Sequence, residues 1–475
     1  MSNNYGIFIN GSFIERDDKL LVKNKYSGET FATVSKASKE DVLKAIEISH
    51  KTFKDFSKTP AYKRANILEK TSSLIIENTK LLSETLASEA GKPIKFAKGE
   101  VARAAETFKF ASEEAKRISG ETIPLDASSS GEKRKGYYQR YPIGVVGAIT
   151  PFNFPLNLVA HKVAPAIAAG NTIVLKPASS TPVSSLILAN LLTQAGLPNG
   201  VLNVVVGSGS TVGDIIVEHP LVKKITFTGS AEVGESIIRK AGIKKVTLEL
   251  GNNSAVIVDE SADLQKAVKA CTVAAFANSG QVCISLQRLF VHEKVYDSFL
   301  DEFIKSTKSL KVGDPLLDDT DIGPMIDIKE AERAENWIKE AVDKGAKILV
   351  GGGREAAILH PTILSDVDDN MRVCREEIFA PVVSVFKYSS FNEAVERANN
   401  TDYGLQAGVF TKDLEKTFYA IDNIDVGGVI INDSSMYRAD HMPYGGNKRS
   451  GLGREGVKYA IEEMTNIRMV VFNLS

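Results

Sequence analysis

The sequence has few cysteines, a single tryptophan and almost no net charge. Its 475 residues include three cysteines, and 58 Lys and Arg stand against 59 Asp and Glu, a net charge of -1. Three widely spaced thiols do not form a disulfide framework and fit a reducing cytosol, so we expect a cytoplasmic protein. The balanced charge gives no reason to expect nucleic acid or an anionic membrane as a partner.

Long apolar runs and clustered histidines are also missing. No uninterrupted apolar stretch is long enough to span a bilayer, and residues 1–18 lack the basic and apolar regions of a signal peptide. The six histidines form no pair at metal-ligand spacing, so we expect no catalytic metal. The length exceeds what one hydrophobic core supports, which favours two or three domains.

The N-terminal quarter has the apolar spacing of amphipathic helices. Residues 39–56, 60–90 and 95–118 place apolar side chains three and four positions apart, and we expect helices there. The Gly-, Pro- and Ser-rich stretch that follows, up to residue 142, predicts an extended excursion from the main body.

From residue 143 the chain alternates short apolar strands with helices. Such alternation predicts a mostly parallel sheet covered by helices, and it starts again after Leu248, so we expect two α/β domains. The C-terminal segment, residues 464–475, has the pattern of one exposed strand. A terminal strand has a free edge, and residues 134–141 are its candidate partner, in the same chain or in another subunit.

Two strand ends have the features of a nucleotide site. At residues 227–234 a strand passes through a glycine turn into a helix, whose N-terminal N–H groups suit a phosphate, although small-residue turns open many helices. Lys176 is the stronger signal, because it stands where a predicted strand ends and a Pro and Ser/Thr turn begins.

Six motifs, in order, resemble the aldehyde dehydrogenase superfamily: PFNFP (151–155), VLKPASSTP (174–182), FTGS (227–230), LELG (248–251), GQVC (280–283) and EEIFAPV (376–382). The resemblance extends from about residue 7 to residue 456. It implies an α/β fold of three parts: a Rossmann-like nucleotide-binding domain (1–123 and 142–249), a catalytic domain (250–446), and a small bridging β element for oligomerisation (124–141 and 453–475). It also implies a homotetramer or homodimer.

The resemblance assigns the catalytic roles. Cys283 corresponds to the nucleophile, whose thiolate adds to an aldehyde and leaves a thioester after hydride transfer. Glu249 corresponds to the general base, and its apolar neighbours predict a raised carboxyl pKa. Asn153 corresponds to the oxyanion donor, together with the backbone N–H of Cys283. Without the resemblance, an idle thiol, an ion-paired strand-end glutamate and a turn asparagine are equally acceptable readings.

The same carry-over implies an NAD or NADP site. Lys176 is expected at the adenosine ribose, Gly229 and Ser230 at the pyrophosphate, Glu377 at the nicotinamide ribose and Phe379 beside the nicotinamide. The remaining expected cofactor contacts are Thr150, Ser179, Gly213 and Leu250, with Gly207 and Gly213 interpreted mainly as turn and packing glycines near the adenine.

The chain departs from the family pattern at some positions. Ser179 stands where strict NAD enzymes often have Glu, which favours use of NADP, alone or alongside NAD. Asn252 replaces a usual glycine, a change without a functional interpretation. Glu249 is present, whereas members that form acyl-CoA products typically lack it, so we expect a free acid.

The predicted substrate is a short polar or anionic aldehyde, such as lactaldehyde, a semialdehyde, or one carrying carboxylate, sulfonate or phosphate. Arg103 resembles an arginine that holds the anion in some members, but Val282 stands where a second one often occurs. The residues expected to line the tunnel are Phe152, Phe154, Asn157, Arg103, Tyr437 and Arg438, with Asp440 and His441 nearby. Alternatively, Arg103 pairs with Glu100 or Glu106 on its own helix and Arg438 forms a loop ion pair.

Three other functions stay open on the sequence alone. They are a general aliphatic aldehyde dehydrogenase, a catalytically inactive structural or binding protein on the same scaffold, and a thiol esterase. The two other cysteines have simpler interpretations: Cys271 suits packing within a helix, and Cys374 has no evident partner.

Overall fold

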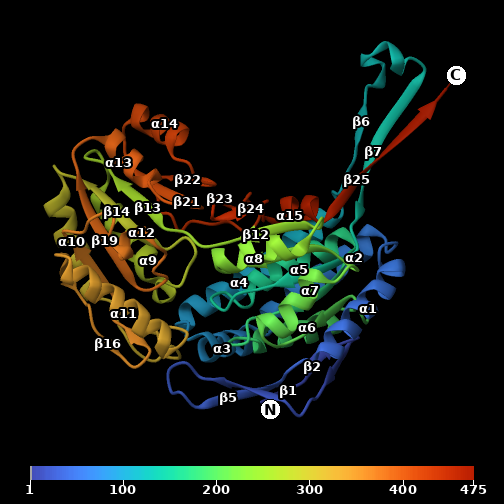
Figure 1. Cartoon of the computed structure of the whole chain (residues 1–475), viewed down its shortest axis with the longest axis horizontal. Coiled ribbons are helices and arrows are strands. Elements are labelled where there is room, and N and C mark those ends of the chain that lie inside the picture. Colours follow the sequence, from blue (N-terminus) through green and yellow to red (C-terminus); the bar gives the residue numbers. More distant parts are fainter. Residues whose placement is uncertain (1–2, 475) are drawn as a thin grey trace.

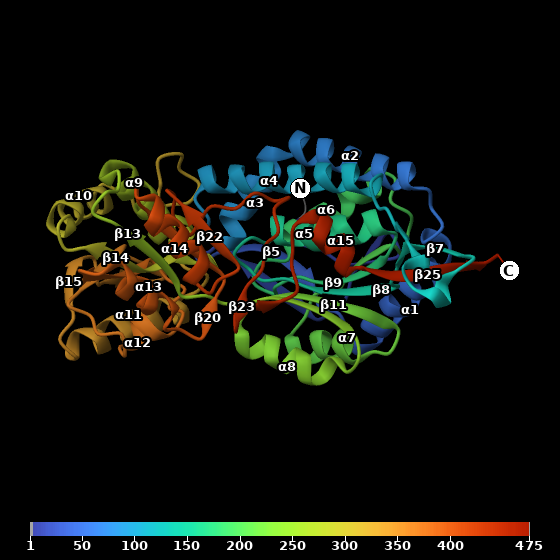
Figure 2. The same cartoon turned by 90° about the horizontal axis from the view of Figure 1, so that it is seen from above.

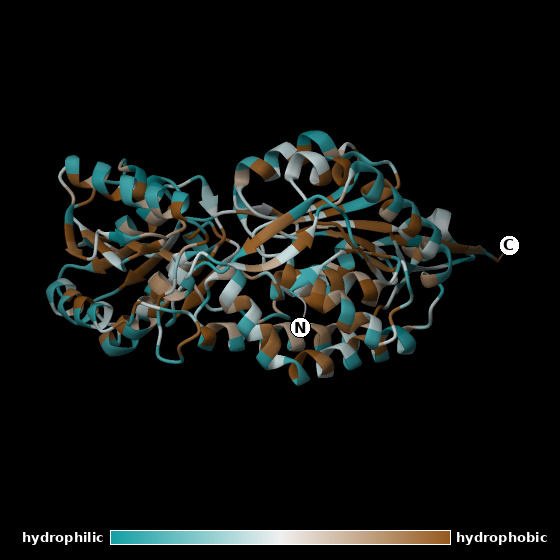
Figure 3. Cartoon of the chain, turned by 90° about the horizontal axis from the view of Figure 1, so that it is seen from below, coloured by the Kyte–Doolittle hydropathy of each residue, from teal (hydrophilic) through white to brown (hydrophobic). Residues whose placement is uncertain are grey.

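The computed structural model describes residues 3–474 and contains two α/β bodies side by side, with an arm that projects from one of them (Figures 1 and 2). The first body holds an eight-stranded sheet and the second a seven-stranded sheet. Their strands are largely hydrophobic, and the covering helices turn hydrophilic faces outward (Figure 3). Within the described residues, no helix is long and apolar enough to cross a membrane.

The predicted N-terminal helices are confirmed. They are α1 (Lys39–Phe56), α2 (Ala61–Glu77), α3 (Thr79–Ala90) and α4 (Ile94–Ala115). Helix α1 starts at Ser38, whose hydroxyl accepts from Asp41 N while the Asp41 carboxylate accepts from Ser38 N. This reciprocal pair satisfies backbone groups that the helix cannot pair itself. Helices α2 and α4 pack together over α5 (Asn157–Ala169).

The eight-stranded sheet has the order β24-β12-β11-β8-β9-β10-β2-β3, with neighbours from β12 to β10 parallel. Its strands are β2 (Ile7–Ile9), β3 (Ser12–Ile14), β8 (Val145–Ile149), β9 (Thr172–Lys176), β10 (Leu202–Val204), β11 (Val222–Thr228), β12 (Lys245–Glu249) and β24 (Gly451–Leu452). Helices α6 (Val183–Gln194), α7 (Asp214–Glu218) and α8 (Ala231–Ala241) connect them, and a small sheet of β1 (Asn4–Tyr5), β4 (Lys19–Lys23) and β5 (Thr30–Ser35) lies beside it.

The seven-stranded sheet has the order β15-β18-β19-β14-β13-β21-β22 and is parallel except at β15. Its strands are β13 (Ser254–Val258), β14 (Leu286–His292), β15 (Lys347–Val350), β18 (Thr362–Ser365), β19 (Val382–Tyr388), β21 (Gln406–Phe410) and β22 (Gly428–Ile431). The helices are α9 (Leu264–Phe276), α10 (Tyr296–Lys308), α11 (Ile328–Asp343), α12 (Arg372–Arg375), α13 (Phe391–Asn399) and α14 (Leu414–Asn423). Short strand pairs complete the fold: β16 (Arg354–Glu355) with β17 (Ile358–Leu359), and β20 (Tyr403–Gly404) with β23 (Asn447–Lys448).

The projecting arm is made of β6 (Glu121–Ile123), β7 (Arg134–Pro142) and the terminal strand β25 (Thr465–Asn473) (Figure 1). Strand β25 pairs antiparallel with β7 along its whole length, so the predicted partner of the terminal strand is correct and lies in the same chain. Two predicted boundaries shift. Strand β6 pairs with β7 and belongs to the arm, and α15 (Val457–Glu463), placed with the arm by sequence, packs on α4 and α5 instead.

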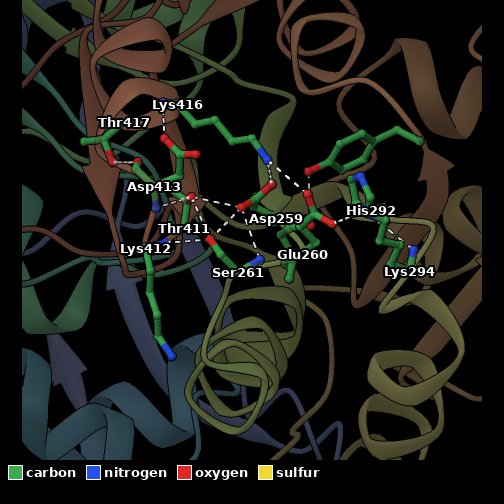
Figure 4. A network of polar contacts seen from close by, with 12 residues as sticks. Asp259, Glu260, Ser261, His292, Lys294, Thr411, Lys412, Asp413, Lys416 and Thr417 are labelled. Carbon is green, nitrogen blue, oxygen red and sulfur yellow. Dashed lines mark hydrogen bonds and ion pairs between the residues drawn. The ribbon is translucent and has the colours of Figure 1, made fainter.

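A network of polar contacts links neighbouring segments at one end of the seven-stranded sheet (Figure 4). Asp259, directly after β13, accepts hydrogen bonds from Lys416 Nζ at 2.6 Å and Ser261 Oγ at 2.6 Å, and a third from Thr411 Oγ1 at 3.0 Å. Although burial alone would raise the pKa of Asp259, these partners hold it below its ordinary value. The network joins β13, the end of β21 and the start of α14.

Candidate active site

A strained turn presents Cys283 to a cavity. After α9 the chain forms a short turn in which Asn278, Ser279 and Gly280 all have left-handed backbones, with φ of 52°, 55° and 69°. A side chain at Gly280 would come within 2.0 Å of a backbone carbonyl oxygen, so glycine is required there. Such strain persists only where surrounding structure enforces it, commonly at functional sites. Here the strained turn places the Cys283 thiol in a partly exposed position at the cavity.

Asn153 is fixed against this turn. Its Nδ2 donates to the carbonyl oxygen of Gln281 at 2.9 Å, and Asn278 Nδ2 donates to its backbone oxygen at 3.3 Å. An amide nitrogen carries two hydrogens, so a second can reach an oxygen bound beside the thiol. The predicted proximity of Asn153 to the segment that carries Cys283 is therefore seen.

Glu249 ends β12 as a buried carboxylate without partners. Both side-chain oxygens are buried and accept no hydrogen bond from residues 3–474. Burial, and then the negative charge of Glu455, raise the pKa of Glu249 well above its ordinary value. The negative charge of Glu249 in turn contributes to the raised pKa of the Cys283 thiol. A carboxylate in this state is suited to accept a proton near neutral pH.

The pKa of the Glu455 carboxyl group is lowered, whereas that of Glu249 is raised. Glu455 accepts from Lys162 Nζ at 2.7 Å and from Arg438 Nη2 at 3.2 Å. Burial alone would raise its pKa, but these cations lower it to about 2. Glu455 therefore remains charged, and its negative charge keeps Glu249 protonated to higher pH.

The cavity in front of Cys283 is lined by most of the predicted substrate residues, namely Arg103, Phe154, Asn157 and Arg438. Both predicted arginines are already paired. Arg438 binds Glu455, and its guanidinium lies 3.6 Å from the centre of the Tyr444 ring. Its Nε is buried and has no hydrogen-bond partner among residues 3–474.

Arg103 has a partner that sequence-local reasoning could not find. Its Nε and Nη2 donate to the two carboxylate oxygens of Asp440 at 3.0 and 2.7 Å. Asp440 also accepts from Asn157 Nδ2 at 3.1 Å and lies 2.7 Å from His161 Nε2. The alternative pairing of Arg103 with Glu100 or Glu106 is wrong, since Glu100 binds Lys92.

Two predicted tunnel residues lie elsewhere. Tyr437 is 54% exposed and is not among the residues that line the cavity, whereas its neighbours Met436 and Arg438 are. Phe152 packs edge-on against Phe379, with ring centres 6.0 Å apart, and it is not among the residues that line the cavity.

The predicted cofactor residues gather at the carboxyl ends of adjacent parallel strands. Thr150 follows β8 and donates its N–H to the oxygen of Lys176, the last residue of β9. Ser230, after β11, caps α8 through Val233 N. The hydroxyl of Thr150 is buried without a partner in the described chain. Dinucleotides bind at such strand ends in α/β sheets, so these residues fit a nicotinamide dinucleotide.

Small residues leave room along this edge. A side chain at Gly229 would come within 2.4 Å of the Phe227 ring, and one at Gly234 within 2.6 Å of Leu250. Gly213 lies against the Lys176 side chain, as a β-carbon there would be 3.7 Å from Lys176 Cδ. Burial lowers the pKa of Lys176 to about 8.

Ser179 borders a second hollow on the same side. Its hydroxyl donates to the carbonyl oxygen of Gly207 at 2.9 Å. The hollow is also lined by Lys36, Ser208 and Thr211. No acidic side chain stands at position 179, and the group that faces this hollow is a neutral hydroxyl.

Glu377 and Phe379 come from the second body. Glu377 Oε1 accepts from Asn252 N at 2.9 Å, and burial raises its pKa to about 7. A β-carbon on Gly251 would lie 2.3 Å from Glu377 Oε2. Phe379 has a φ of 48°, an uncommon backbone for a bulky residue. The two bodies therefore contribute to one site.

Five site residues were not identified from sequence. Tyr444 contacts Cys283, the Lys92–Glu100 pair lies along the cavity, and Lys162 anchors Glu455. Tyr444 and Glu455 lie within the stretch up to residue 456 that the family resemblance covers, which was the available signal. Lys92 and Lys162 are fully buried lysines that ordinary helix patterns do not distinguish from exposed ones.

A strand edge of the dinucleotide-binding type, together with a partly exposed thiol, an amide beside its turn, and a buried carboxylate that is unpaired among residues 3–474, is typical of an α/β oxidoreductase. The family model described as "Aldehyde dehydrogenase family" matches residues 13–470. The chain belongs to this family and is an NAD(P)-dependent aldehyde dehydrogenase.

Curated relatives match over nearly the whole chain. The 3-sulfolactaldehyde dehydrogenase of Priestia megaterium is 50% identical over 471 residues, covering 99% of this chain and 98% of that protein. The lactaldehyde dehydrogenase of Methanocaldococcus jannaschii is 44% identical over 471 residues, covering 98% of this chain and 100% of that protein.

Solved structures agree with the fold. Aldehyde dehydrogenase 21 from Physcomitrella patens, in complex with the reaction product succinate, superimposes with a TM-score of 0.98 at 44% identity, covering 100% of this chain and 99% of that one. Glyceraldehyde-3-phosphate dehydrogenase GapN from M. jannaschii, complexed with NADP, gives 0.93 at 45% identity, covering 97% and 100%. The predicted three-part α/β fold is thereby confirmed.

Proposed function

We propose that the protein oxidises a short polar or anionic aldehyde to its free acid. The Cys283 thiolate attacks the carbonyl carbon, and Asn153 and the backbone N–H of residue 283 donate to the resulting oxyanion. The nicotinamide cofactor, when bound, accepts the hydride that leaves this carbon. Glu249 then takes a proton from a water that attacks the thioester, which releases the acid and the thiol.

The main support for this substrate class is the buried Nε of Arg438. This N–H lies on a residue that lines the cavity with Cys283, and no described residue accepts its hydrogen bond. A buried donor without a partner costs free energy, which a bound carboxylate, sulfonate or hydroxyl would recover. Arg103 lines the same cavity, and Asp440 holds its planar guanidinium in a fixed orientation. The names of the relatives, which refer to sulfolactaldehyde and lactaldehyde, support the same class.

A substrate panel tests this class. Catalytic efficiency is compared for sulfolactaldehyde, lactaldehyde, succinate semialdehyde and hexanal, in wild type, Arg103→Ala and Arg438→Gln. We expect the anionic aldehydes to lose about 100-fold more than hexanal in the Arg438 variant, since a charge-assisted hydrogen bond contributes about 1.5–3 kcal/mol. Preference for hexanal, with equal losses for all substrates, would instead indicate a general aliphatic aldehyde dehydrogenase.

The nucleophile is tested by Cys283→Ala. Loss of a covalent nucleophile should lower turnover by about 10⁴-fold or more. Cys271→Ala and Cys374→Ala are the controls, because both thiols are buried away from the cavity. Wild-type turnover in Cys283→Ala would disprove the mechanism and leave an inactive-scaffold or different-nucleophile explanation.

We propose that NADP is used, alone or alongside NAD. A glutamate at position 179 would repel a 2′-phosphate by roughly 4 kcal/mol at about 4 Å and an effective dielectric of about 20. Ser179 avoids that repulsion, and Lys176 can pair with the phosphate. Ser179→Glu should shift preference toward NAD, whereas Ser208→Ala serves as a control in the same hollow. Wild-type kinetics with no measurable NADP rate would refute the proposal.

We also propose that the arm forms a homodimer or homotetramer interface, beside a nucleotide-binding and a catalytic domain. Support comes from β25, whose second edge pairs with no strand within residues 3–474. The strand and the residue that follows it expose several apolar side chains: Ile467, Met469, Val471, Phe472 and Leu474. Light scattering of wild type against Ile467→Lys/Val471→Lys tests this, and a monomeric wild type would refute it.

We propose a cytoplasmic location on the basis of the three cysteines, none of which forms a disulfide. Cell fractionation with an antibody against the protein would test it, and recovery outside the cytoplasm would contradict it.

A further inference from the structure

The thiol of Cys283 has a tyrosine hydroxyl as its hydrogen-bond partner within residues 3–474. The hydroxyl of Tyr444 lies 3.1 Å from Cys283 Sγ. The Tyr444 side chain is 4% exposed, so water competes little for this contact. The ring that carries this hydroxyl is contacted by the Arg438 guanidinium, which lies 3.6 Å from the ring centre.

We propose that Tyr444 is a positioning residue that donates a hydrogen bond to the Cys283 thiolate and holds it toward the cavity. The inference rests on the proposed role of Cys283 as nucleophile. A thiolate can only accept a hydrogen bond, so the phenol O–H must be the donor in the reactive state. Phenylalanine would fill the same volume and keep the stacking with Arg438, but it would offer the sulfur no proton.

The surroundings of the thiol disfavour its charged form, so the thiolate requires a hydrogen-bond donor. Burial raises the pKa of Cys283 to about 11, and the charges of Glu249 and Glu377 add to this, whereas Tyr444 and Arg438 oppose it. The remaining charged groups across the cavity are Lys92, Lys95, Glu100 and Arg103. Among these groups, Tyr444 is the one within hydrogen-bond distance of Sγ in the described chain.

The same contact fixes direction. Cys283 follows a turn of strained backbone, and Asn153 reaches that turn through Gln281. A hydrogen bond from Tyr444 therefore fixes the orientation of the sulfur beside the turn that Asn153 contacts. Attack geometry then depends on a side chain 161 residues further along the chain.

The test measures the thiol itself rather than turnover. Wild type, Tyr444→Phe and the control Tyr437→Phe are treated with iodoacetamide from pH 6 to 10, and the modified Cys283 peptide is quantified by mass spectrometry. Tyr437 is an exposed tyrosine seven positions earlier in the same segment. Losing a charge-assisted hydrogen bond of about 1.5 kcal/mol should raise the apparent thiol pKa by about one unit and slow alkylation at pH 7.5 about ten-fold.

Each outcome decides the question. A raised pKa in Tyr444→Phe alone supports the proposal, and circular dichroism and thermal unfolding confirm that the variant is folded. An alkylation profile identical to wild type, or an equal shift in Tyr437→Phe, overturns it. The labelled peptide is measured whether or not the enzyme turns over. A failure of the nucleophile assignment would appear separately, as retained turnover in Cys283→Ala.

Discussion

Asp259 and Glu249 are two buried carboxylates at the carboxyl ends of strands in the two sheets, and their pKa values are shifted in opposite directions. Asp259 directly follows β13 and receives hydrogen bonds from Lys416, Ser261 and Thr411, which lower its pKa. Glu249 ends β12 with no partner for either oxygen among residues 3–474, and its pKa is raised. The first carboxylate stabilises the fold, whereas the second keeps a basic site at the expense of stability.

Of the two carboxylates, Glu249 should have the larger effect on activity when it is removed. Glu249→Gln keeps the volume but abolishes the base, so turnover should fall by about 10²–10⁴-fold. The first hydride transfer precedes water activation and should be affected less. Stopped-flow absorbance should therefore show a rapid burst of reduced cofactor followed by slow turnover. Glu376→Gln, an exposed neighbour of Glu377, is the control, and loss of the burst together with turnover would contradict the assigned role.

Removing the Asp259 charge should act on stability instead. Asp259→Asn leaves Lys416 without its buried partner, and the free energy of unfolding should fall by about 3 kcal/mol. Activity per folded molecule should stay near wild type. Denaturant unfolding measures the first quantity and active-site titration the second. Glu260→Gln, which alters the more exposed carboxylate beside it, is the control and should cost less stability than Asp259→Asn.

The two carboxylates should give opposite pH dependence. The folded pKa of Asp259 is lowered, so its stabilisation is present above the unfolded pKa near 4 and is lost as pH falls through the folded value. The folded pKa of Glu249 is raised, so the folded state binds the extra proton and stability falls as pH rises above about 4.5. Unfolding free energies from pH 3 to 8 should lose the acidic slope in Asp259→Asn and flatten at higher pH in Glu249→Gln. Unchanged profiles in both would break the comparison.

The smallest expected effect belongs to Ser261. Its hydroxyl donates to Asp259 at 2.6 Å and accepts from Lys412 N at 2.8 Å. Ser261→Ala removes one neutral partner but leaves the charge pair with Lys416, so the loss should be about 1 kcal/mol. A loss as large as that of Asp259→Asn would mean that the hydroxyl, rather than the charge pair, organises the network.

The sequence was sufficient to predict features that depend on local patterns or on motifs. The capped helix at residues 39–56, the β7–β25 pairing and the placement of Cys283 after a polar turn all follow from short patterns. Arg103 shows the limit. Helix spacing suggested partners three residues away, but the actual partner is Asp440, 337 residues along the chain.

Side-chain direction was the other limit. Met436, Tyr437 and Arg438 are consecutive, and only the structure tells which of them face the cavity. Tyr444 lies within the stretch that the family resemblance covers, but its significance comes from a 3.1 Å contact with a side chain 161 residues earlier in the chain. Such contacts depend on tertiary packing, which has no local sequence signal.

The placement of β24 constrains how the enzyme is made. This two-residue strand pairs with Leu248 and Glu249, although it comes from residues 451–452. The entire second body lies between Glu249 and β24 in the sequence, so it must be synthesised before β24. During synthesis, which proceeds from the N-terminus, the strand that bears Glu249 therefore stays an open sheet edge until almost the whole chain has emerged. A nascent or truncated chain that stops before residue 451 contains every catalytic side chain, but β12, which carries the base, has no neighbouring strand on its outer side. The ability to catalyse the reaction is therefore acquired last.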